Sequence, residues 1–440
     1  MVRLRVYLFL AICLQLLLSA CGDSGSSNYG VPSAIVTNEL ILPKTGSNYQ
    51  EVRHIVLRGT NYKIGKALAQ ISNDYYQAQM MSFSLQIYKE SRNSYIQQFF
   101  PNLAERQKGI AEYYGSGASD LRDTSALWYD MQPVKCSAIF FPKTVTANGH
   151  SFQARDMDFY TVDMWEFTSD PPVPGHGNKM FSRNFVLETY PQDGGYAAMV
   201  VGTYDLLNGA YDGFNEHGLT ISGLVDQELS NTQGGTVTQL NLLPEQTGLS
   251  YLQMVRLILE GARNIEEAEQ LVSKLTVYFP LDGIHFLLGD RTGKSTVLEF
   301  YKKNPEDLNL SFIFIPQPTD RPAIMTNHSI RVYPDPSYFV QPVSIEPYNT
   351  FYRYMRLYDY LQASYFHKYT PDDGLYAMSM VYGYADDGSE GGAKPFPVRT
   401  IWSLVMDIDD LSLKIKFYTT DNVAQQTPLF TDAYTFKMQK

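Results

Sequence analysis

Residues 136–141 read Cys-Ser-Ala-Ile-Phe-Phe, and residues 154–159 read Ala-Arg-Asp-Met-Asp-Phe. The pair Asn148-Gly149 stands between these two segments. Asn-Gly is a strong signal for a tight turn between antiparallel strands. A hairpin with this turn would bring the charged residues of the second segment back beside Cys136. The spacing therefore predicts a two-stranded unit with a thiol and both signs of charge close together.

Arg155 and Asp158 are the charged residues of the hairpin that matter most for chemistry. A cation near a thiol favours the nucleophilic thiolate, and a nearby carboxylate can orient a base. Asp156 fits a salt bridge as well as a site role. Because an isolated cysteine is most often a small buried hydrophobic residue, the case for Cys136 as a nucleophile depends on these neighbours.

The composition describes a globular chain with a substantial core. It has 440 residues, of which 44% are hydrophobic and 18% charged, and its net charge is −11. An acidic chain lacks the basic footprint that nucleic acid requires. Three cysteines and seven histidines, among them His217, His285 and His328, show no disulfide framework or metal-ligand spacing. No phosphate-binding or dinucleotide glycine motif occurs, so we expect no cofactor, no metal and no nucleic-acid partner.

The N-terminus predicts export. Arg3 and Arg5 precede a short apolar run that ends in Leu18-Ser19-Ala20-Cys21. This pattern is typical of a secretory signal peptide. Its last four residues resemble the bacterial lipobox, which implies that Cys21 is acylated and becomes the new N-terminus. An ordinary signal peptide is the alternative. A lipid anchor at Cys21 would attach the protein to a membrane of the cell envelope, and Gly22 favours the outer membrane of a Gram-negative host.

Four parts are predicted along the chain. The signal peptide takes residues 1–20, and a Gly- and Ser-containing tether takes residues 21–50. A helical prosegment takes residues 51–135, with three- and four-residue apolar spacing. From residue 136 to residue 440, short apolar segments alternate with turns around one helix pair. This last part is predicted to be a layered α+β unit.

A family resemblance runs through this last part. The segments that carry it are Cys136–Ile139 with Ala154–Phe159, Tyr211–Leu219, His285–Asp290, Met325–Asn327, Tyr352–Arg356 and Arg399–Trp402. In this order they resemble the N-terminal-nucleophile amidases of the choloylglycine hydrolase group, which includes bile salt hydrolases and penicillin V acylases. In the prosegment, residues 56–65 look like the start of the acyl-coenzyme A:6-aminopenicillanic acid acyltransferase relatives.

The resemblance implies a four-layer αββα sandwich preceded by the helical prosegment. It also implies self-cleavage between Lys135 and Cys136, which would free the α-amino group of Cys136. The site residues that it implies are Cys136 as nucleophile, Arg155 beside the thiolate, Asp158 beside the α-amine, Asn327 and the backbone N–H of Val225 at the oxyanion, and Arg353 in the surrounding polar network.

Two residues depart from the family pattern. Val225 stands where bile salt hydrolases have Asn, which weakens a bile-salt assignment. Lys135 places a positive side chain at the expected cleavage point. The sequence therefore predicts a lipid-anchored hydrolase of an N-acyl amide with an apolar acyl group. A non-catalytic binding lipoprotein and an acyltransferase to an acceptor amine stay open as alternatives, as do the individual substrate and the homo-oligomeric state seen in many relatives.

Overall fold

The computed structural model describes residues 33–439 apart from residues 77–79, 84, 118, 128–134, 164–165, 167–177, 205, 208, 232–248, 279–282, 305–309, 342–348, 364–366 and 387–395. The predicted signal peptide, Cys21 and the first part of the tether lie outside the described residues. From Ala34 to Lys440 the chain forms one compact unit. Among the helices described, none has the length and apolar character needed to span a bilayer.

The larger sheet has nine strands, and their order differs from that of the chain. β2 pairs in parallel with β7, whereas the other neighbouring strands are antiparallel. Across the sheet the strands are β1 (Ile35–Leu42), β2 (Glu51–Gly59), β7 (Arg183–Pro191), β8 (Ala198–Thr203), β9 (Asp212–Asn215), β10 (Thr220–Val225), β13 (Ile284–Gly289), β14 (Ser295–Tyr301) and β15 (Ser311–Pro316).

The second sheet has eight strands and contains the predicted hairpin. Cys136 lies opposite Met157 in an antiparallel pair. The pairing ends at Phe141 and Phe152, so residues 142–151 connect the two strands in place of the expected tight turn, and Gly149 within this connection has a φ of 72°. The strands are β16 (Ala323–Met325), β5 (Lys135–Phe141), β6 (Phe152–Tyr160), β18 (Val398–Asp407), β19 (Ser412–Asn422) and β20 (Thr427–Phe430), with β17 (Tyr384–Ala385) on β18 and β21 (Tyr434–Lys437) on β19.

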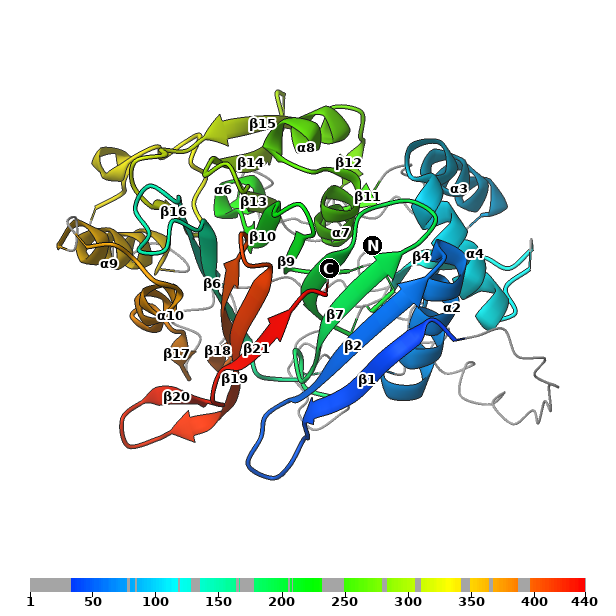
Figure 1. The fold of residues 1–440 in the computed structure, drawn as a ribbon, viewed down its shortest axis with the longest axis horizontal. Coiled ribbons are helices and arrows are strands. Elements are labelled where there is room, and N and C mark those ends of the chain that lie inside the picture. Colours follow the sequence, from blue (N-terminus) through cyan, green and yellow to red (C-terminus); the bar gives the residue numbers. More distant parts are fainter. Residues whose placement is uncertain are drawn as a thin grey trace, which may run out of the picture. The chain divides into compact units, whose positions relative to one another are not determined.

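Helices cover the outer face of each sheet (Figure 1). α2 (Asn61–Ile71) packs on β2 and β7, and α7 (Tyr251–Gly261) packs on β8, β9 and β10. On the other side, α9 (Thr350–Ala363) and α10 (Pro371–Ser379) pack on β5 and its neighbours, while β5 contacts β10 and β13 of the facing sheet. The fold is therefore the expected α+β sandwich of four layers, αββα.

The remaining elements are short or lie beside these layers. They are the π-helix η2 (Ser72–Tyr76), α3 (Gln86–Phe99), α4 (Pro101–Tyr113), α6 (Gln227–Asn231), α8 (Ile265–Val272), the 3-10 helix η4 (Pro336–Tyr338) and the strand pairs β3 (Met80–Ser82) with β4 (Arg122–Leu127) and β11 (Leu249–Ser250) with β12 (Val277–Tyr278). Asn264 caps α8, because its side chain accepts a hydrogen bond from the backbone of Glu267.

The alternation of side chains along β5 decides which way the thiol faces. Phe140 packs against Gly289 of the nine-stranded sheet, so Cys136 and Phe140 point between the sheets. Ile139 and Phe141 belong to the second apolar cluster, which includes side chains of α9 and α10. Cys136 therefore points into the core between the sheets, where its side chain is completely buried.

The N-terminal part differs from the predicted division of the chain. β1 lies within residues 21–50, which were expected to be a tether, and β2 precedes the first helix of the expected helical prosegment. β2 enters the nine-stranded sheet because its backbone pairs with β7 along its whole length. The expected boundary between residues 135 and 136 falls inside β5, and the compact unit runs through it.

Candidate active site

Arg155 of β6 lies directly beside the thiol of Cys136. Its Nη2 donates to Cys136 Sγ at 3.2 Å and to the carbonyl oxygen of Gly223 at 3.2 Å. Its Nη1 lies 3.2 Å from Oδ2 of Asp212, and both of these side chains are completely buried. The ion pair with β9 of the facing sheet therefore fixes the guanidinium over the thiol.

The surroundings of Cys136 disfavour the ionised form of its thiol. Burial raises the pKa of the Cys136 thiol to about 12, and Asp158 and Asp156 act in the same direction. Arg155 and Arg353 lower this pKa, but their effect is smaller than that of burial. A protonated thiol is a poor nucleophile, so attack by Cys136 requires a group that accepts the thiol proton.

Asn327 lies on the other side of Cys136, just after β16. The main-chain N–H of Cys136 donates to Asn327 Oδ1 at 3.0 Å. Asn327 Nδ2 donates to the carbonyl oxygen of Val225 at 2.9 Å. An amide nitrogen carries two hydrogens. Among the described residues, only one hydrogen of Asn327 Nδ2 has an acceptor, so the second can bind another group. The side chain thus links the end of β10 to the start of β5.

Arg353 reaches the same point from α9. Its Nη1 donates to Ser137 Oγ at 2.7 Å and to the carbonyl oxygen of Cys136, and its Nη2 donates to Asn327 Oδ1 at 2.5 Å. Arg353 is buried, whereas Arg356 on the next turn of the helix is exposed. Arg353 therefore ties the backbone of Cys136 to the side chain of Asn327.

Asp158 lies opposite Lys135 in the β5–β6 pair. Asp158 Oδ1 accepts hydrogen bonds from Thr400 Oγ1 and, at 3.4 Å, from the backbone N–H of Gly383. A Cβ atom at Gly383 would lie 2.9 Å from Asp158 Cγ. Only glycine leaves room for the carboxylate at this approach. The strand register thus places Asp158 opposite the residue that precedes Cys136.

Asp156 is a second buried carboxylate in this region. Neither of its oxygens has a hydrogen-bond partner among the described residues. Burial raises its pKa well above the ordinary value, and Asp158 adds to this effect, while Arg353, Arg155 and Lys135 oppose it. A carboxyl group in such surroundings favours its neutral form.

The structure brings together all six residues that the sequence singled out for the reaction. It also adds residues that sequence reasoning missed. Asp212 pairs with Arg155 and accepts a hydrogen bond from Trp402 Nε1 at 3.0 Å, while Thr400 and Gly383 bind Asp158. A buried arginine demands a counter-ion, but nothing in the local sequence indicates that the counter-ion comes from the other sheet.

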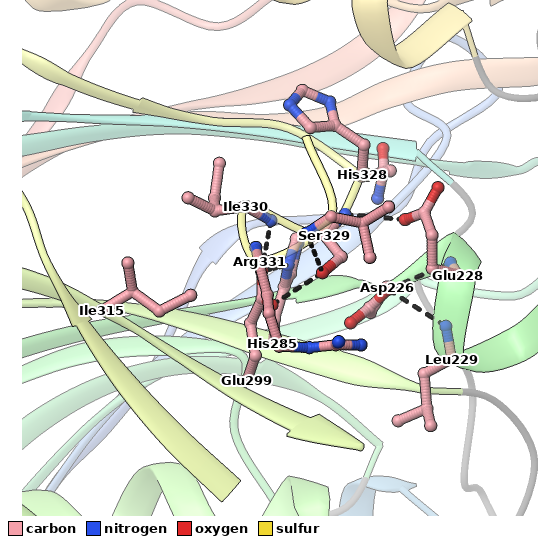
Figure 2. A network of polar contacts seen from close by, with 12 residues as sticks. Asp226, Glu228, Leu229, His285, Glu299, Ile315, His328, Ser329, Ile330 and Arg331 are labelled. Carbon is pink, nitrogen blue, oxygen red and sulfur yellow. Dashed lines mark hydrogen bonds and ion pairs between the residues drawn. The ribbon is translucent and has the colours of Figure 1, made fainter. Parts of the chain in front are cut away.

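One group of potential metal ligands lies apart from the thiol. Donor atoms of Asp226, His285 and Glu299 all lie within 4.8 Å of one another, and the three residues are buried. The sequence indicated no metal-ligand spacing for His285, because the three residues come from different segments. Glu299 accepts hydrogen bonds from Ser329, Ile330 and Arg331 (Figure 2), so its oxygens are already engaged by protein donors. This donor set does not fit a dedicated metal site.

A cavity of about 220 Å³ opens on the other face of the eight-stranded sheet. Ile324 of β16, Leu361 of α9 and Tyr369 are among the residues that line it. These three side chains belong to the apolar cluster under the helices, whereas Cys136 belongs to the core between the sheets. We therefore do not assign the acyl-binding site to this cavity.

Comparison with known proteins finds a match to one family model over part of the chain. Residues 175–368 match the family model described as acyl-coenzyme A:6-aminopenicillanic acid acyl-transferase. The match lies within the predicted catalytic part, although the sequence suggested that family from residues 56–65. A search of curated proteins finds no match.

Solved structures show a more distant likeness. Penicillin V acylase from Agrobacterium tumefaciens is 17% identical, with a TM-score of 0.40 over 68% of this chain and 86% of that one. A cysteine-to-alanine mutant of conjugated bile acid hydrolase from Clostridium perfringens is 14% identical, with a TM-score of 0.43 over 69% of this chain and 97% of that one. At these scores neither structure informs the reaction of this chain.

Proposed function

We propose that this chain, a relative of the acyl-coenzyme A:6-aminopenicillanic acid acyl-transferases over residues 175–368, hydrolyses the amide bond of an N-acyl substrate. The single observation that supports this most strongly is the setting of Cys136. Its Sγ receives a hydrogen bond from Arg155, and its backbone nitrogen donates to Asn327. A thiol, a cation and an amide side chain at one peptide bond suit attack on a carbonyl group.

The proposed first step is self-cleavage between Lys135 and Cys136. Cys136 Sγ attacks the carbonyl carbon of Lys135, the C–N bond breaks, and the thiol proton passes to the departing nitrogen. Water then hydrolyses the thioester, which leaves a carboxyl group on Lys135 and a free α-amine on Cys136. The carboxylate of Asp158, opposite Lys135 in the strand pair, is suited to receive a hydrogen bond from that amine.

The proposed turnover uses the new α-amine as the base. An α-amino group has a pKa near 8, so it can accept the thiol proton near neutral pH. The thiolate, stabilised by Arg155, attacks the amide carbonyl of the substrate. Asn327 and the backbone N–H of Val225 serve as donors to the oxyanion, a contribution of about 3 kcal/mol per donor in comparable sites. The amine product leaves with the proton, and water hydrolyses the acyl-enzyme.

Acyl transfer is the second candidate, and the family match favours it. The description of that family names an acyl-transferase, in which an amine takes the acyl group in place of water. A binding lipoprotein with no turnover is the third. In each case we propose that Cys21 anchors the protein to a membrane of the cell envelope and that the ligand is a small N-acyl amide with an apolar acyl group.

A panel of N-acyl amides tests these proposals, with conjugated bile acids, penicillin V, acyl-homoserine lactones and fatty-acid amides as members. We expect hydrolysis of at least one member by the protein and none by Cys136→Ala. Added amine separates acyl transfer from hydrolysis by the appearance of a new amide. Hydrolysis that survives in Cys136→Ala, or no turnover of any member, would contradict the proposed enzyme.

Self-cleavage has its own readout. The purified protein should give two bands on a denaturing gel, and N-terminal sequencing of the larger fragment should start at Cys136. The Cys136→Ala variant is the matched control, and it should remain one band. One intact band for the unmodified protein would exclude the proposed activation.

A further inference from the structure

We infer that the buried residues His285 and Glu299, together with the partly buried Glu228, form a frame that holds the loop carrying Asn327. Residues 326–331 make up this loop, called the Asn327 loop below. The three side chains bind the loop and act on the reaction only through it, so they are positioning residues. The link to catalysis rests on the proposed function, which gives Asn327 its role at the oxyanion.

His285 of β13 holds the first residue of the loop. Its Nε2 lies 2.8 Å from the carbonyl oxygen of Thr326, directly before Asn327. Because a carbonyl only accepts, this ring nitrogen carries the hydrogen. The other ring nitrogen, Nδ1, lies 3.7 Å from Oε1 of Glu299. The imidazole therefore connects the loop to the neighbouring carboxylate.

Glu299 of β14 holds the other end of the loop (Figure 2). Its carboxylate accepts hydrogen bonds from Ser329 Oγ at 2.7 Å, from the backbone N–H of Arg331 at 3.2 Å and from the backbone N–H of Ile330. Buried backbone amides outside regular structure need partners. One buried carboxylate meets this need for two consecutive backbone amides of the loop and also binds the hydroxyl of Ser329.

Glu228 adds a contact from the start of α6. Its Oε2 accepts from the backbone N–H of Ser329 at 2.6 Å. At the first residue of the same helix, the backbone N–H of Gln227 donates to the carbonyl oxygen of Asn327 at 2.9 Å. Asp226 Oδ1 in turn accepts from the backbone of Glu228 at 3.0 Å. The segment that begins with Val225 is thus fastened to the Asn327 loop.

These contacts set the distance between the two proposed oxyanion donors. Asn327 is held at its carbonyl oxygen by Gln227 and, on either side, by His285 and Glu299. Its side chain binds the carbonyl oxygen of Val225. An oxyanion donor is effective only within about 2.7–3.1 Å of the developing charge. Loss of the frame would therefore reduce stabilisation of the transition state more than it reduces the affinity for substrate.

The test compares Glu299→Gln with the unmodified protein. Glutamine has nearly the shape of glutamate, but its side-chain NH2 cannot accept the hydrogen bonds that the backbone N–H groups of the loop donate to Glu299. We expect faster hydrogen exchange at the amides of Ile330 and Arg331. We also expect a fall in kcat of up to about 100-fold with KM changed by less than about twofold, since misplacement by 1 Å can have this effect. Glu266→Gln on the exposed face of α8 is the matched control, and neither value should change there.

Ser329→Ala is a milder variant, for use if Glu299→Gln fails to fold. It removes one donor to the carboxylate, and we expect changes in the same directions but smaller. Unchanged exchange in the loop would overturn the frame, and faster exchange with an unchanged kcat would overturn its positioning role. If the unmodified protein hydrolyses no amide, the proposed function fails, yet the exchange measurement still decides whether the frame exists.

Discussion

Cys136 and Asn327 are 191 residues apart in the chain and are joined by a hydrogen bond of 3.0 Å from the main-chain nitrogen of Cys136 to Asn327 Oδ1. The nitrogen in this bond is the one that self-cleavage would convert from an amide into an amine. An amine at this position keeps hydrogens to donate, so Asn327 can hold the nucleophile before and after the cut. One contact therefore serves both proposed steps.

The buried pair of Arg155 and Asp212 leads to a first prediction. In Asp212→Asn the guanidinium would keep its charge without its buried counter-ion. Removal of one partner of such a pair costs about 3 kcal/mol or more, and we expect a loss of this size in the free energy of unfolding, measured by urea denaturation. Asp359→Asn on the exposed face of α9 is the control. A difference between the two variants below about 1 kcal/mol would contradict the prediction.

The raised pKa of the Cys136 thiol leads to a second prediction. At pH 8 a thiol with a pKa of about 12 is almost wholly protonated, and Cys136 is also inaccessible in the intact chain. Iodoacetamide should therefore label fragment 136–440 at least about tenfold faster than the intact chain, because only the thiolate reacts. Intact-mass spectrometry follows both species in one sample. Rapid labelling of the intact chain would show that the thiol is neither buried nor protonated.

Gly383 leads to a third prediction. In Gly383→Ala the new methyl carbon would lie 2.9 Å from Cγ of Asp158. Because the methyl group is fixed to the backbone, the carboxylate of Asp158 would have to move. We expect slower self-cleavage, followed as the fraction of intact chain over time, and reduced amide hydrolysis. Gly46→Ala is the control, since no atom lies within 4 Å of a Cβ at that position. Equal cleavage rates in the two variants would refute the role given to this close approach.

The pairing of β2 with β7 leads to a fourth prediction. The two strands are paired from Glu51 to Gly59, and β1 and α2 pack beside them. After the cut, fragments 21–135 and 136–440 should therefore remain together in native size-exclusion chromatography. They should separate only in denaturant. Elution of fragment 136–440 alone under native conditions would be incompatible with a shared sheet.

The local part of the site could be predicted from the sequence. A hairpin between β5 and β6 could be expected because its strands are neighbours in the chain, but residues 142–151 connect them, so a tight Asn148-Gly149 turn does not set the register that brings Arg155 to Cys136. Val225, Asn327 and Arg353 were found through a family resemblance. Periodicity could not have placed them, because Asn327 and Arg353 reach Cys136 across 191 and 217 residues of chain.

Other features had no signal in the local sequence. Asp212 belongs to the facing sheet, and its pairing with Arg155 depends on how the two sheets stack. β2 was missed because its partner β7 lies more than 120 residues later, and a parallel pair leaves no turn to recognise. β1 was missed with it, since β1 pairs only with β2 in this sheet. The frame around Asn327 was missed for the same reason, since His285, Glu299 and Glu228 come from three separate segments.

The place of β2 in the nine-stranded sheet has a consequence for how the protein stays at its membrane. Under the proposed processing, the lipid on Cys21 and the thiol of Cys136 end up on different polypeptides. The fragment with the nucleophile would then be retained at the lipid surface solely by non-covalent pairing with its lipidated companion, chiefly along β2 and β7. The catalytic fragment would then stay at the membrane only as long as the two fragments remain associated. Mild denaturant should release the catalytic fragment in soluble form, while the acylated fragment stays at the membrane.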